Sequence, residues 1–326
     1  MTRRFISLLL ITLLIGGGIA GIAGCGNPAT DEPQNQPPAS TSSTTTTEDS
    51  AWPRTYTDAA GRTVTLEKFP EKIVVDYLPY WEYLMALGIM PAGASSAEHY
   101  RQTWDAFEDY EVSGVEDMGD PTLNLEKLTA LAPDLIFIAT PDGVENLEKI
   151  APVIVMDGQL GQDSRYALRE FGKILGLEDE AEERITQFDA QLASDREQLS
   201  ATLEGKTVVM LSVMGKDRYF SARRGEFYDP ALGLGFTAPT GYPEFGAGYQ
   251  QVPLETLAEM NPDILFLAVF NGDEAIAEEL QSSPVWQTIQ AVKDGMVFTI
   301  DGAAHSTSIV STEYTADKMV DFLLAK

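Results

Sequence analysis

The sequence predicts an α/β fold in which two Rossmann-like lobes, each with a central sheet, are joined by a single long rigid helix. The main observation is an internal repeat: residues 123–140 read LNLEKLTALAPDLIFIAT and residues 252–269 read VPLETLAEMNPDILFLAV, and the two align without gaps. In each copy a short helical pattern stops before Pro-Asp, and the continuous apolar run that follows is typical of a strand buried in a parallel sheet. The length of 326 residues also suits two lobes. Two similar units within one sheet are the alternative, because such units share their composition.

The first residues have the order of an export signal. Arg3 and Arg4 precede an apolar stretch and then a run of small residues that leads to Cys25. We therefore expect residues 1–24 to be a signal peptide. An uncleaved membrane helix is the alternative, although several glycines make this segment a poor one. The letters IAGC that end at Cys25 resemble a bacterial lipobox, which implies that this cysteine carries lipid and anchors the mature chain.

Residues 25–53 are predicted to be a flexible linker between the lipid anchor and the folded part. The stretch NPATDEPQNQPPASTSSTTTTEDS at 27–50 contains no aromatic residue and no Val, Leu or Ile, so it cannot bury enough surface to fold. The folded lobes would then lie outside the cytoplasm, tethered to the outer face of a bacterial cell membrane.

The folded part is expected to comprise an N-terminal lobe at 54–162, an interlobe helix at 163–177 and a C-terminal lobe at 178–326. Besides the two strands of the repeat, apolar runs predict strands at 72–77, 151–156, 207–213 and 295–300.

The interlobe helix is predicted from apolar residues at helical spacing, namely Leu168, Phe171 and Leu175. Asp163 or Ser164 can cap its start, and Gly176 lies near its end. A second, more acidic helical pattern follows over 178–203. A single helical crossing is stiffer than a pair of extended strands, so we expect only small lobe motions.

The composition excludes several classes of function. A net charge of -28 disfavours binding to nucleic-acid phosphates or to an acidic membrane surface. The single cysteine excludes an internal disulfide, and the two histidines are too few for a histidine-rich site for free metal. No enzyme motif is found, so we expect a binding protein and not an enzyme. A secreted hydrolase and a surface-anchored sensor or interaction protein are the rival classes.

Aromatic and basic residues are concentrated where the predicted strands end, and ligands of open α/β sheets bind beyond the carboxyl ends of the strands. The candidate ligand-binding residues are Tyr77, Tyr80, Trp81, Tyr219, Phe220, Arg223, Arg224, Tyr228 and His305. For any one aromatic residue, packing in the core is an equally good explanation. The adjacent arginines suggest an anionic or oxygen-rich ligand, with a salt bridge to Glu226 or Asp229 as their alternative.

Several motifs together resemble those of the iron-siderophore and cobalamin substrate-binding proteins of ABC importers, the class III periplasmic binding proteins. They are the lipobox, NLEKLTALAPDLI at 124–136, PLETLAEMNPDIL at 253–265, SPVW at 283–286 and AVKDGMV at 291–297. The resemblance covers about residues 54–326. It implies a ferric chelate held between two lobes that are joined by one rigid helix, with no cofactor, no direct metal ligand, and a monomeric protein.

The resemblance also implies that one glutamate on each lobe docks into arginine pockets of the permease. By motif position these are Glu126 and Glu255. Their alternative role is local, since the helix dipole favours an acidic residue in the first turn.

Few basic residues are available for a highly anionic catecholate chelate; Arg223, Arg224 and Arg165 are the candidates. Aromatic walls with few charges suit a neutral or cationic ferric hydroxamate better, so a hydroxamate siderophore is favoured. Heme, with Met214, Tyr219 or His305 as an axial ligand, and cobalamin stay open as alternatives.

Overall fold

The computed structural model describes residues 52–161, 163–215, 219–221, 224–244 and 250–326. The predicted signal peptide, the lipid-carrying Cys25 and most of the linker lie outside these residues. Within the described part, no helix is both long enough and apolar enough to cross a membrane.

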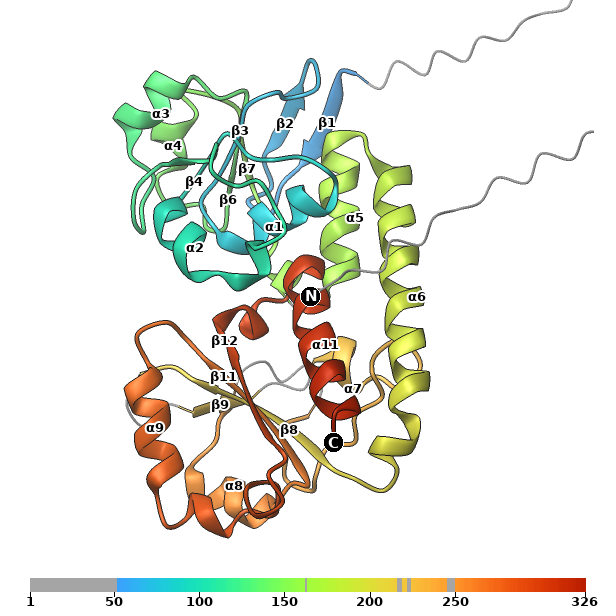
Figure 1. The fold of residues 1–326 in the computed structure, drawn as a ribbon. Coiled ribbons are helices and arrows are strands. Elements are labelled where there is room, and N and C mark those ends of the chain that lie inside the picture. Colours follow the sequence, from blue (N-terminus) through green and yellow to red (C-terminus); the bar gives the residue numbers. More distant parts are fainter. Residues whose placement is uncertain (1–51, 162, 216–218, 222–223, 245–249) are drawn as a thin grey trace, which may run out of the picture. The chain divides into compact units, whose positions relative to one another are not determined.

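The first sheet is parallel throughout and has the strand order β5-β4-β3-β6-β7 (Figure 1). In sequence order this is the 3-2-1-4-5 arrangement of a Rossmann half, with a reversal of strand order at β3. Its strands are β3 (Ile73–Val75), β4 (Gly93–Ala94), β5 (Glu116–Asp117), β6 (Leu135–Ile138) and β7 (Val153–Val155). Its helices are α1 (Leu78–Ala86), α2 (Ala97–Thr103), η1 (Asp105–Phe107), α3 (Leu125–Leu131) and α4 (Val144–Leu147), and a hairpin of β1 (Arg54–Thr57) and β2 (Thr63–Leu66) precedes them.

The second sheet has the order β10-β9-β8-β11-β12, in which β8, β11 and β12 are parallel neighbours and β9 pairs antiparallel with both β8 and β10. Its strands are β8 (Val208–Val213), β9 (Tyr219–Ser221), β10 (Gln250–Gln251), β11 (Ile264–Val269) and β12 (Val297–Asp301). The helices around it are α7 (Gly225–Tyr228), α8 (Leu254–Met260), α9 (Glu274–Ser282), η3 (Trp286–Thr288), α10 (Gln290–Lys293), η4 (Gly302–His305) and α11 (Ile309–Leu324). The predicted α/β class with two sheets is confirmed.

Two helices connect the sheets. The first, α5 (Ser164–Leu175), is capped by Asp163, whose carboxylate accepts hydrogen bonds from two backbone N–H groups of the first turn, and it ends at Gly176 in the left-handed region (φ 71°). The second, α6 (Glu178–Leu203), contacts α5 and α11, whereas α5 contacts α1 and β1. Figure 1 shows α6 running beside both lobes. The lobe boundaries at 162 and 178 stay a prediction.

Both copies of the repeat form a helix, a turn and a buried strand, α3–β6 and α8–β11. Each helix ends at a residue in the left-handed region, Ala132 or Asn261, directly before Pro-Asp. Asp134 then accepts hydrogen bonds from two backbone N–H groups just before β3, at 2.9 and 3.1 Å. Asp263 accepts them from the backbone N and Oγ1 of Thr207 just before β8, at 2.7 and 2.8 Å. The Pro-Asp pair therefore has a structural role in both lobes, because it holds the neighbouring strand in register.

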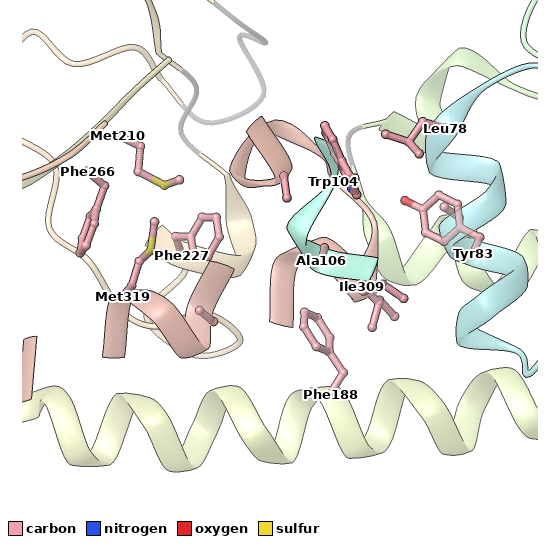
Figure 2. Close-up of a cluster of buried hydrophobic side chains, with 14 of the residues drawn as sticks. Leu78, Tyr83, Trp104, Ala106, Phe188, Met210, Phe227, Phe266, Ile309 and Met319 are labelled. Atoms are coloured by element: carbon pink, nitrogen blue, oxygen red, sulfur yellow. The ribbon is translucent and has the colours of Figure 1, made fainter. Parts of the chain in front are cut away.

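The largest hydrophobic cluster is continuous through both lobes. Figure 2 shows its middle, where Tyr83 of α1, Phe188 of α6 and Ile309 of α11 gather with residues of η1. The first turns of α11 thus pack against the N-terminal lobe, and α1 and α11 are in direct contact. The lobes share one core beneath the region where their strands end.

Candidate ligand-binding site

A cavity of about 260 Å³ lies between the two sheets, with walls from the segments that follow β3, β11 and β12 and from α2. This is the position expected for a ligand of an open α/β sheet, beyond the carboxyl ends of parallel strands. The lining residues are Tyr77, Leu78, Pro79, His99, Tyr100, Thr103, Trp104, Phe270, Asn271, Gly302, His305, Ser306 and Thr307.

Aromatic rings from both lobes form much of the wall. Tyr77 is 49% exposed and meets Tyr80 edge-on, with ring centroids 5.3 Å apart. Tyr100 and Trp104 make a similar edge-on pair at 5.6 Å. Such rings supply large apolar contact areas at a low cost in conformational entropy, which suits the organic shell of a bulky ligand.

His305 is the titratable group of the second-lobe wall. Its Nδ1 lies 3.3 Å from Ser212 Oγ, and its ring meets Phe270 edge-on at 5.2 Å. Burial, with a smaller contribution from the positive charge of Arg224, lowers the pKa of His305 to about 4. The imidazole is therefore neutral at pH 7.

Among the described residues that line the cavity, none is Asp, Glu, Lys or Arg. Hydroxyl groups, an amide and the two histidines provide its polarity. An anionic ligand would find no lysine or arginine on this part of the wall, and burying an unpaired charge is costly.

Two of the residues singled out from the sequence, Tyr77 and His305, line the cavity. Tyr80 is almost fully buried behind Tyr77, where its ring lies 5.6 Å from that of Phe171. Trp81 has no exposed surface and packs 4.7 Å from the ring of Phe107. These last two side chains contribute to the core beneath the cavity.

The arginine pair and its neighbours lie in and around β9 and α7. Arg224 is buried and donates hydrogen bonds to Thr312 Oγ1 and to the carbonyl of Ala304, and its guanidinium lies 3.7 Å from the Glu226 carboxylate. For Arg224 the structure therefore agrees with the alternative of a salt bridge to Glu226. The hydroxyl of Tyr228 donates to the carbonyl of Val208 within the second-lobe core. Tyr219 and Phe220 belong to β9, whose side chains are not described, and Arg223 lies outside the described residues.

Sequence reasoning missed the contribution of α2. This short helix and the residue after it bring His99, Tyr100, Thr103 and Trp104 to the cavity. The strand before it, β4, has two residues and gives no apolar run that would mark a strand end. The sequence signal for this part of the site was local: a helical turn rich in aromatic residues directly follows Ser95 and Ser96.

Glu126 and Glu255 are exposed in the first turns of α3 and α8. Neither carboxylate has a hydrogen-bond or ion-pair partner among the residues the structure describes. The two helices belong to different lobes and lie on the side away from α6 (Figure 1). Their first turns thus present two separate acidic groups on the surface.

A family profile described as periplasmic binding protein matches residues 73–304. The iron(3+)-hydroxamate-binding protein FhuD of Bacillus subtilis (strain 168) is 30% identical over 294 residues, covering 87% of each chain. The Fe(3+)-citrate-binding protein YfmC of the same organism is 29% identical over 259 residues, 76% of this chain and 78% of that one.

Among solved structures, a periplasmic binding protein component of a Fep/Fec-like ferrichrome ABC transporter from Bacillus subtilis superimposes with a TM-score of 0.68 at 26% identity, covering 82% of this chain and 99% of that one. The resemblance inferred from the motifs, and the expectation of a binding protein instead of an enzyme, are confirmed. With its two α/β lobes, the cavity between their sheets and the profile match across both, the chain belongs to the periplasmic binding protein family.

Proposed function

We propose that this chain is the extracytoplasmic receptor of an ABC importer that captures a ferric siderophore between its lobes and delivers it to the permease unchanged. The observation that carries the proposal is the cavity at the carboxyl ends of both sheets, with aromatic walls from each lobe. Relatives named for binding iron(3+)-hydroxamate and Fe(3+)-citrate support iron chelates as the class of ligand.

Within that class we infer a hydroxamate siderophore. Three hydroxamate groups neutralise Fe³⁺, so the chelate core is neutral, whereas catecholate and citrate chelates are anionic. The described walls, which contain no Asp, Glu, Lys or Arg, fit the neutral core best. Neutral His305 can hydrogen-bond the chelate without adding charge.

The cavity is smaller than the roughly 300–1000 Å³ of typical ligand sites, so part of the chelate must extend beyond it or the walls must move apart. We infer small displacements of the loops and lobes, because a core shared by α1, α6 and α11 opposes a large hinge motion.

Delivery is proposed to use Glu126 and Glu255, one on each lobe, against arginines of the permease. Two exposed carboxylates on separate lobes set the orientation of a docked protein better than either alone. Lipid at Cys25, as in relatives named as lipoproteins, would keep the receptor at the membrane.

The test is a panel of ligands titrated against tryptophan fluorescence, which Trp104 in the cavity wall should report. The panel contains ferrichrome, ferrioxamine B, ferric enterobactin, ferric citrate, hemin and cobalamin, with the iron-free siderophores as controls. We expect saturable quenching and the tightest binding for a ferric hydroxamate. Preference for an anionic chelate, hemin or cobalamin would overturn the hydroxamate assignment, and no saturable response to any of them would overturn the receptor function.

A further inference from the structure

Glu82 is a fully buried carboxylate in α1, directly beneath the cavity. It accepts hydrogen bonds from Ser306 Oγ at 2.5 Å, from Trp104 Nε1 at 3.2 Å and from Ser311 Oγ. Burial raises the pKa of Glu82, and these donors oppose that rise because they stabilise the charged form. Through its bonds to Ser306 and Ser311, the carboxylate links α1 of the first lobe to the start of α11 and to the segment before it.

Two of the three donors are cavity-lining residues, Trp104 and Ser306. Ser306 Oγ donates its hydroxyl hydrogen to Glu82 Oε2, so this hydrogen points at Glu82 and away from the cavity. Ser306 Oγ also accepts the backbone N–H of Ser308 at 3.3 Å, which leaves it one lone pair for a ligand. The indole N–H of Trp104 is likewise committed, so Trp104 offers the ligand only its ring.

Thr103 also carries a hydroxyl group in the cavity wall, and the hydrogen of that group is likewise bonded within the protein. Its Oγ1 donates to the backbone carbonyl of His99 at 2.9 Å. Ser306 and Thr103, two of the cavity-lining residues with a hydroxyl group, therefore present lone pairs and no hydrogen to a ligand.

We propose that Glu82 is a positioning residue that determines specificity: by holding the hydrogens of Ser306 and Trp104, it leaves Ser306 as a hydrogen-bond acceptor toward the cavity and selects chelates that carry an N–H donor at this point of their organic shell. The inference rests on the proposed function, since it assigns the polarity of the same site. An N–H group that meets Ser306 or Thr103 finds a partner for its hydrogen. A chelate with a methyl group in that place gains none and leaves the hydroxyl oxygens without a donor.

A matched pair of probes tests this polarity. Ferric tris(acetohydroxamate) carries an N–H on every hydroxamate, whereas ferric tris(N-methylacetohydroxamate) carries none, and both are neutral. Their dissociation constants are measured by fluorescence with excess hydroxamic acid, and the acid alone serves as the blank. We expect the wild-type protein to prefer the N–H chelate about fivefold to tenfold, the equivalent of one hydrogen bond.

Glu82→Gln keeps the shape of the side chain but adds an N–H₂ donor that competes with the Ser306 hydroxyl, so the preference should fall to about twofold or less. Ser306→Ala removes the acceptor together with its hydrogen bond to Glu82 and should lower the preference as well. Glu226→Gln is the matched control, because Glu226 is also buried and accepts a hydrogen bond from Ser164 Oγ at 2.8 Å but is not among the residues that line the cavity. The Glu226→Gln variant should show the same preference for the N–H chelate as the wild-type protein.

Equal affinity of the wild-type protein for the two probes would overturn the inference while leaving the receptor function intact. An undiminished preference in Ser306→Ala, with a wild-type unfolding temperature, would overturn it too, even if Glu82→Gln does not fold. Failure of the receptor function is a different result, namely no response to any ligand of the larger panel.

Discussion

Acidification should destabilise the protein through His305. Its pKa is about 4 in the folded chain against 6.5 when exposed, because burial penalises the imidazolium. Between these values the unfolded chain binds more protons than the folded one, so stability falls as the pH falls. One pKa unit corresponds to 1.36 kcal/mol, so this residue costs about 2 kcal/mol at pH 5 and about 3 kcal/mol below pH 4. The cost becomes negligible above about pH 7.5, where the unfolded chain also leaves the imidazole neutral.

The measurement compares the wild type with His305→Gln in urea unfolding at pH 7 and at pH 5. All other acids and bases are common to both proteins, so the difference in their stability should change by about 2 kcal/mol between the two values, in favour of the variant at pH 5. A proton NMR titration provides the second readout. The chain has two histidines, so the variant assigns the His305 signal. A titration midpoint near 6.5, or the same pH dependence in both proteins, would refute the reasoning.

Three further outcomes are expected. Glu126→Ala combined with Glu255→Ala should abolish siderophore uptake by cells while the chelate dissociation constant stays unchanged; normal uptake would refute the docking assignment. Asp263→Ala removes two hydrogen bonds at the entry to β8 and should lower the free energy of unfolding by about 2 kcal/mol in urea, without affecting docking; an unchanged stability would contradict that role. Tyr77→Ala should weaken chelate binding about tenfold, whereas Tyr166→Ala, at a comparably exposed tyrosine outside the cavity, should not; equal effects would remove Tyr77 from the site.

Much of the fold followed from local patterns. The repeat located α3–β6 and α8–β11, and the ends of α5 followed from Asp163 and Gly176. The two-residue strands β4 and β5 could not be predicted from the sequence, because they are defined by pairing with neighbouring strands and not by an apolar run.

The site was harder to predict, since it depends on which way each ring points. Leu78 to Met85 are all buried in α1, so no polar face marks the side of the helix that meets a ligand. The sequence therefore did not distinguish Tyr77 from Trp81 as ligand-binding residues, although Tyr77 lines the cavity and Trp81 lies in the core. Arg224 was ambiguous for a similar reason, because its partners Thr312 and Ala304 are remote in sequence.

The contact between α1 and α11 also bears on how the protein matures after export. Helix α1 emerges early in the chain, but the element that covers Glu82 is the final one, so the first half cannot complete its interior until the carboxyl terminus has arrived. Contacts between such distant segments slow folding. A translocated chain that stops short of α11 would display bare apolar surface and a Glu82 carboxylate without its Ser311 partner, and quality-control proteases would recognise it before any cargo is bound.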